Sequence, residues 1–136
     1  MDESQPSERV VEQRIRNQII EYFELAASYD EQLAYEKNVP IAHVPYEVID
    51  QWTDCVPAGT LKAVKDPSVF STSELHELHD FQLVWASTAS AVPDDYPLLR
   101  DVQALPAWDR LRQQAERALR VFEVRGKLPE DREVVE

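Results

Sequence analysis

The sequence predicts an all-α protein, a single domain in which three to four main helices form a bundle-like array. Apolar residues recur at steps of three and four over long stretches, whereas no segment alternates with the period of two expected of a strand. β-branched residues never cluster, and a length of 136 residues suits one hydrophobic core. We therefore expect one acidic helical domain over residues 1–136, with disordered ends at 1–6 and 129–136.

The first helix is expected over residues 8–37. Ser7 suits the N-cap position, and Asn38 and Pro40 provide the stop. One stripe of apolar residues follows the helical period between these limits: Ile15, Ile19, Tyr22, Ala26, Tyr29 and Leu33. This continuous stripe predicts one long amphipathic helix.

A second, shorter helix is expected over residues 45–55. Pro45 suits a first helical position, and Pro57 and Gly59 end the pattern. The stretch 58–70 is the least regular, and its pattern fits either a short extended piece or another helical turn.

The third helix should begin at Ser71, because Ser71 followed by Glu74 forms a capping-box pattern. Pro93 closes this helix, and a brief helical segment is expected near residues 97–104. Pro106 then begins the last helix.

The three tryptophans fall at core positions of three different helices. These residues are Trp52, Trp85 and Trp108. Asp50 and Asp54 bracket Trp52, so a partly exposed position, as an anchor for a partner, is the alternative for Trp52.

The composition is strongly acidic, with 14 basic and 26 acidic side chains and a net charge of −12. This excess argues against nucleic acid or an anionic membrane as the partner, because both would be repelled, and it favours a basic partner. The single cysteine excludes an internal disulfide and a cysteine-rich zinc site. The N-terminal residues lack a signal-peptide pattern and no apolar run reaches 18 residues, so we expect a cytoplasmic protein.

The charge is concentrated in the first two thirds of the chain. Residues 1–37 carry 4 basic and 9 acidic side chains, and residues 97–136 carry 8 of each. The middle stretch, 38–96, carries 9 acidic side chains against only Lys62 and Lys65. A concentrated acidic surface of this kind can accelerate and orient the docking of a basic protein, although acidic helix faces are also ordinary solvated surface.

The candidate partner-binding residues are carboxylates of this middle region and two tyrosines in helix-start or turn settings. The carboxylates recur at helical spacing in two helices and again in the turn after Pro93. The full set is Glu47, Asp50, Asp54, Glu74, Glu77, Asp80, Asp94 and Asp95 as charge contributors, with Tyr46 and Tyr96 as anchors.

No pattern predicts an enzyme, a metal site or a cofactor. His76 and His79 are spaced i and i+3, unlike the i and i+4 histidines of helical zinc proteases, although His76 and Asp80 share a face and His43 could supply a third ligand. No Gly-x-Ser-x-Gly turn surrounds any serine, and two glycines exclude a glycine-rich phosphate loop. Cys55 has no basic neighbour, so we expect a buried structural thiol.

The stretches RIRNQIIEY (residues 14–22) and VPYEVIDQW (residues 44–52) resemble small bacterial toxin-immunity proteins of contact-dependent growth inhibition systems. The resemblance covers about the first 56 residues. It implies a cytosolic protein that binds and neutralises one cognate toxin domain, commonly a basic nuclease, and it assigns no individual residue. An acidic regulatory adaptor or DNA-mimic protein that binds a basic cellular factor is the alternative.

Overall fold

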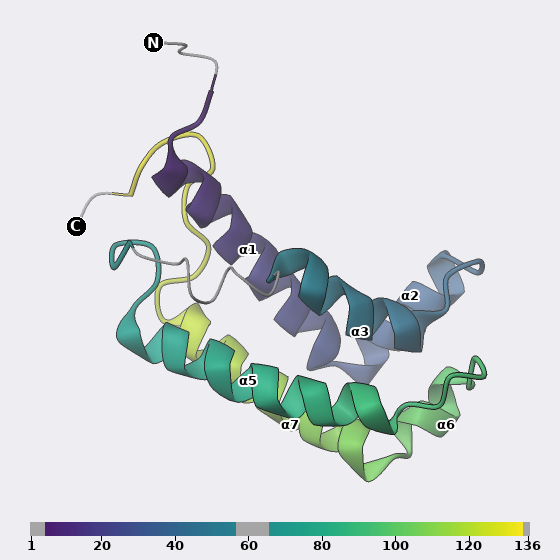
Figure 1. Ribbon diagram of the computed structural model, residues 1–136. Coiled ribbons are helices and arrows are strands. Elements are labelled where there is room, and N and C mark those ends of the chain that lie inside the picture. Colours follow the sequence, from purple (N-terminus) through teal and green to yellow (C-terminus); the bar gives the residue numbers. More distant parts are fainter. Residues whose placement is uncertain (1–4, 57–65, 135–136) are drawn as a thin grey trace.

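The computed structural model describes residues 5–56 and 66–134, and within them it contains six helices and no strand. The predicted all-α class is confirmed, with more helices than the three to four expected. In chain order (Figure 1) the helices are α1 (Glu8–Ala26), α2 (Tyr29–Asn38), α3 (Val44–Cys55), α5 (Thr72–Ala91), α6 (Leu99–Gln103) and α7 (Pro106–Glu123).

The single helix expected over 8–37 is wrong, because the chain breaks between α1 and α2. Ser28 has an extended backbone, and its hydroxyl accepts a hydrogen bond from the Glu31 amide at 3.1 Å, as an N-cap of α2. The buried Gln32 side chain donates to the carbonyls of Leu25 and Ala26 at the end of α1. The apolar period continues across the break, so the stripe alone did not reveal it.

The other predicted helix starts agree with the structure. At the start of α5, the Ser71 hydroxyl accepts from the Glu74 amide, and the Glu74 carboxylate accepts from the Ser71 amide. Pro106 begins α7, and α3 covers the predicted 45–55 helix. Of the stretch left open, residues 66–70 form a turn before α5, and 58–65 lie outside the described residues.

The helices enclose one hydrophobic core. Figure 1 shows α5 and α7 side by side, with α1 and α3 covering them. Aromatic rings from these layers meet at the centre, where the Phe81 ring centroid lies 5.1 Å from that of Phe23 and 4.6 Å from that of Trp52. Such aromatic contacts bury large apolar areas and hold the layers in one arrangement.

Trp52 belongs to this core, so it is not a partly exposed anchor. Its side chain is fully buried, and its indole Nε1 donates to Gln82 Oε1 at 2.7 Å. Trp108 is equally buried and donates to Gln32 Oε1, while the half-buried Trp85 donates to the Ile49 carbonyl at 2.9 Å. The last bond joins α5 to α3.

The C-terminal tail is ordered along α1, contrary to the expected disorder over 129–136. The buried Gln13 side chain donates to the carbonyls of Pro129 and Arg132 at 2.7 and 2.8 Å and accepts from the Val134 amide at 2.8 Å. Asn17 likewise exchanges hydrogen bonds with the backbone of Leu128. The prediction is therefore wrong for 129–134, whereas 1–4 and 135–136 lie outside the described residues.

The start of α1 and the tail lie at one end of the molecule, and the α2–α3 and α5–α6 loops lie at the other (Figure 1). None of the helices in the described part of the chain is long and apolar enough to cross a membrane.

Candidate partner-binding site

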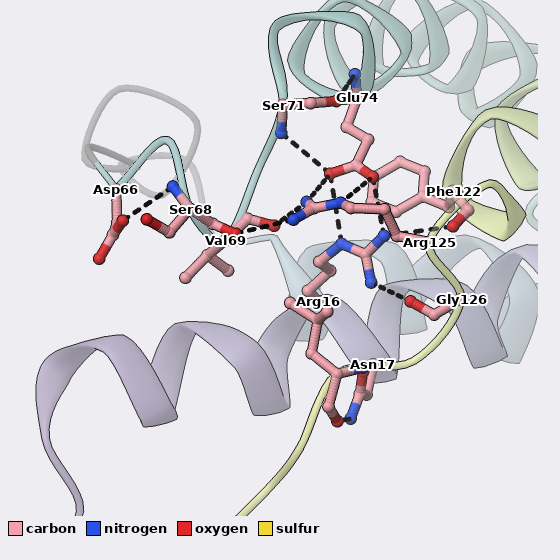
Figure 2. A network of polar contacts seen from close by, with 11 residues as sticks. Arg16, Asn17, Asp66, Ser68, Val69, Ser71, Glu74, Phe122, Arg125 and Gly126 are labelled. Carbon is pink, nitrogen blue, oxygen red and sulfur yellow. Dashed lines mark hydrogen bonds and ion pairs between the residues drawn. The ribbon is translucent and has the colours of Figure 1, made fainter. Parts of the chain in front are cut away.

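Glu74 is a buried structural carboxylate rather than part of an exposed acidic face. Its residue exposure is 2%, and its two oxygens lie 2.7 Å from the guanidinium nitrogens of Arg16 and Arg125 (Figure 2). Arg16 is fully buried and also donates to the carbonyls of Phe122 and Gly126. We call these three charged residues the Arg16–Glu74–Arg125 network.

The network joins three parts of the chain. Arg16 lies on α1 and Glu74 in the first turn of α5, while Arg125 follows α7 and also donates to the carbonyls of Ser68 and Val69. Burial alone would raise the pKa of Glu74, but hydrogen bonds from Arg16, Arg125 and the Ser71 amide outweigh it and hold that pKa below its usual value. Glu74 is therefore a carboxylate anion at neutral pH.

Glu77 is also turned into the protein. Its residue exposure is 6%, and its carboxylate accepts from Arg117 Nε at 3.2 Å and from Gln114 Nε2 at 3.3 Å, both on α7. The predicted assignment of Glu74 and Glu77 to an exposed binding surface is therefore wrong, because both side chains are buried. Sequence spacing placed them on one helix face but did not show that this face packs on arginines from distant segments.

The other predicted carboxylates lie at the surface and make no ion pair within the described residues. They are Glu47, Asp50, Asp54, Asp80, Asp94 and Asp95, of which Glu47 is half-buried and the rest are exposed. The described residues of 38–96 contain no lysine or arginine. The described residues of this stretch therefore supply no lysine or arginine to neutralise these carboxylates.

Tyr46 and Tyr96, the two predicted anchors, are in direct contact. Their ring centroids are 5.1 Å apart, and the His43 ring lies 4.2 Å from Tyr46 and 5.3 Å from Tyr96. The Tyr46 hydroxyl donates to the Pro93 carbonyl at 2.9 Å and accepts from the Tyr96 amide at 3.0 Å. His43 Nε2 lies 2.8 Å from the Pro97 carbonyl, so Nε2 is the donor. The start of α3 is thereby fastened to the α5–α6 loop.

Tyr96 has a left-handed backbone, with φ of +56°, which is uncommon for a residue with a large side chain. The bond from its amide to Tyr46 holds this conformation, and its side chain is presented to solvent with 71% exposure. An outlier that the surroundings enforce is a pointer to function when it lies beside a surface pocket.

Such a pocket adjoins the two tyrosines and has a volume of about 270 Å³. We call it the Tyr46–Tyr96 pocket. Its lining residues come from α3, the end of α5 and the following loop: Tyr46, Ile49, Ala89, Val92, Pro93, Asp94 and Tyr96. Asp94 is the only ionisable carboxylate among them, and no basic residue contributes.

The structure thus brings some predicted residues together and leaves others apart. Tyr46, Asp94 and Tyr96 line one pocket, and Glu47 and Asp95 are their chain neighbours. Asp50 and Asp54 are one and two helical turns farther along α3. Asp80 lies eleven residues before the end of α5, about 16 Å along the helix axis.

Sequence reasoning missed the apolar part of this end of the molecule. Ile41 is 97% exposed in the α2–α3 loop, and Leu98 is 56% exposed just before α6. Single exposed apolar side chains are ordinary on protein surfaces, so these two residues define no patch by themselves. Their position in loops next to prolines, rather than on a helix stripe, was the available signal.

The structure also shows where the other reactive side chains lie. His76 and Asp80 are exposed, and no group of three His, Cys, Asp or Glu side chains in 5–56 and 66–134 is arranged to hold a metal ion. Cys55 is half-buried rather than buried; burial, followed by Asp54 and Glu21, raises the pKa of its thiol. A protonated thiol is a poor nucleophile.

Comparison with known proteins found no matching family model, no matching curated protein and no matching solved structure.

Proposed function

We propose that this chain is an immunity protein that binds a basic toxin domain, of the nuclease kind, and neutralises it by occlusion in the cytoplasm. The observation that carries this proposal is the Tyr46–Tyr96 pocket, which adjoins unpaired carboxylates on a surface where the described residues of 38–96 contain no lysine or arginine. The binding surface comprises the six exposed or half-exposed carboxylates, Tyr46 and Tyr96; Glu74 and Glu77 are excluded from it.

Two physical effects support a binding role. Unpaired carboxylates attract the lysine and arginine side chains with which a nuclease holds phosphates, so they accelerate encounter and compete with the nucleic acid. Exposed aromatic side chains at fixed positions supply the desolvated contacts that dominate interface affinity. Occlusion of this kind needs no catalytic group and no cofactor.

The test is a capture experiment followed by a growth assay. The tagged protein is incubated at low salt with a lysate of its source organism, and the bound proteins are identified by mass spectrometry. We expect a small basic domain, or the C-terminal part of a very large secreted protein. Expression of that partner should then arrest growth, and co-expression of this chain should restore growth.

A charge variant and a matched control define the surface. Replacing Glu47, Asp50 and Asp54 with Ala should weaken partner binding by about tenfold at low salt, since exposed ion pairs contribute up to about 1 kcal/mol each. The control replaces three exposed carboxylates of other elements, namely Glu24, Glu123 and Glu133, and should bind like wild type. Equal affinity of the two variants would contradict the assignment.

The growth assay also separates the alternative function. A captured basic factor that is not toxic, and whose normal activity changes when this chain is bound, would replace the immunity role with that of an acidic regulatory adaptor or DNA mimic. Both functions use the same binding surface, so the growth assay and not the structure separates them.

A further inference from the structure

We infer that the Tyr46–Tyr96 pocket receives a single arginine side chain of the protein partner. This inference rests on the proposed function, because it specifies how the basic partner is held. It differs from a general charge attraction in naming one cavity and one side chain, which is the anchor of the interface.

The lining of the pocket matches the two chemical parts of an arginine side chain. Ile49, Ala89 and Val92 supply apolar surface, on which three methylene groups can be buried. Tyr46 and Tyr96 place aromatic residues in the lining, and a guanidinium group is attracted to the face of an aromatic ring; the Asp94 carboxylate can accept two parallel N–H bonds from the same group.

Other ligand classes fit this pocket less well. An anion would meet Asp94 and the adjoining carboxylates with no basic residue in the lining to hold it. An apolar ligand would desolvate Asp94 without giving it a partner. A lysine would satisfy the charge, but its compact ammonium group neither stacks on the rings as a planar guanidinium does nor binds a carboxylate with two parallel bonds.

The pocket is formed before any partner arrives. The Tyr46 hydroxyl is fixed by the Pro93 carbonyl and the Tyr96 amide, and the His43 ring packs against both tyrosine rings. The left-handed backbone of Tyr96 is held by the same contacts. A preformed site loses little side-chain entropy on binding, which favours its use as an anchor.

A titration with a small probe tests the pocket without any partner protein. Wild-type protein, labelled with ¹⁵N and with ¹³C in its tyrosine rings, is titrated with N-acetyl-arginine-N-methylamide and followed by NMR. The citrulline analogue is the matched control ligand, because it has almost the same shape and no charge. We expect saturable shifts of the Tyr46 and Tyr96 ring signals with the arginine probe and none with the citrulline analogue.

Three variants locate the binding. Asp94→Asn should weaken the probe affinity at least threefold, whereas the neighbouring Asp95→Asn, which does not line the pocket, should change it less than twofold. Tyr96→Asn should abolish saturable binding, because it removes the ring while asparagine tolerates a left-handed backbone. The amide spectra of the variants show whether each remains folded.

The inference is overturned if the shifts do not saturate, if they are spread over Asp50, Asp54 and Asp80, or if the citrulline analogue binds as well as the arginine probe. It is also overturned if Tyr96→Asn binds the captured partner with wild-type affinity, because an anchor residue should cost at least tenfold. None of these results would contradict the immunity role, which the capture and growth assays test separately. Saturable arginine binding in a protein that captures no basic partner would instead contradict the proposed function.

Discussion

Two acidic regions of this molecule use the same side chains in opposite ways. At the start of α5, Glu74 and Glu77 are buried and held by arginines from α1, α7 and the segment after α7. On α3 and in the α5–α6 loop, carboxylates such as Asp50 and Asp94 face solvent and have no ion pair in the described structure. The first region fastens helices together, whereas the second leaves charge available to a partner.

The difference shows that helical spacing of carboxylates indicates a face but not what that face contacts. Burying the charges of the Arg16–Glu74–Arg125 network carries a desolvation cost, so the network as a whole adds little net stability. Removing one of its members is strongly destabilising, because a buried charge is then left without its partner. Like charges on an exposed helix face cost only a few tenths of a kcal/mol per pair. Substitutions should therefore have very different effects in the two regions.

The largest effect is expected for Glu74→Gln. It leaves the fully buried Arg16 without its countercharge, so the free energy of unfolding should fall by about 3–5 kcal/mol. Urea denaturation followed by circular dichroism measures this change. The matched control is Glu47→Gln, which should change the free energy of unfolding by less than about 0.5 kcal/mol. Similar losses in the two variants would remove the distinction between the regions.

Acid should destabilise the fold when it protonates the buried Glu74. The pKa of Glu74 is lowered in the folded state from its ordinary value of 4.5, so its contribution to stability is present above about pH 4.5 and is lost as pH falls through the folded-state pKa. We expect the urea midpoint to fall steeply below that pH in wild type. In Glu74→Gln the urea midpoint should fall less steeply below that pH. An equally steep fall in wild type and in the variant would show that Glu74 is not the carboxylate responsible.

Removing the tail should have an intermediate effect. A chain ending at Leu128 lacks the backbone partners of Gln13, and it should lose about 1–3 kcal/mol in the free energy of unfolding, because each hydrogen bond contributes about 1 kcal/mol. The control chain ends at Val134 and keeps all three bonds. If the two chains have the same thermal midpoint, the order of the tail along α1 contributes nothing to stability.

The smallest effect on stability is expected for the triple variant in which Glu47, Asp50 and Asp54 are replaced by Ala. Its free energy of unfolding should stay within about 0.5 kcal/mol of the wild-type value, because these side chains are surface groups without ion pairs. Its affinity for a basic partner should become less dependent on salt than that of wild type, as measured by titration at several ionic strengths. A larger loss in the free energy of unfolding would show that these carboxylates stabilise the fold.

The fold was predictable where signals are local in the chain. The capping box of Ser71 and Glu74, and the proline at position 106, mark helix starts through contacts within one turn. The break at Ser28 was missed because the apolar stripe continues across it. The order of the tail was missed because it depends on Gln13, which is 116 residues from its acceptor at Pro129.

The candidate site was predictable in part for the same reason. Tyr46 and Tyr96 stood out by their settings next to proline and acidic residues, and the structure places them in contact across 50 residues. Glu74 could not be separated from Asp50 by sequence alone, since its partner Arg16 lies 58 residues away. Only the packing of α1 on the rest of the bundle brings the two together.

The Arg16–Glu74–Arg125 network also has a consequence for biosynthesis. The ribosome makes the chain from its N-terminus, so Arg16 is completed 58 residues before Glu74 and 110 residues before Gly126, whose carbonyl it binds. Until the segment with Arg125 and Gly126 emerges, the growing polypeptide carries a cation that the folded protein buries completely. We therefore expect the domain to fold only after the segment that carries Arg125 and Gly126 has left the ribosome, and products that lack this segment to remain open to cellular proteases.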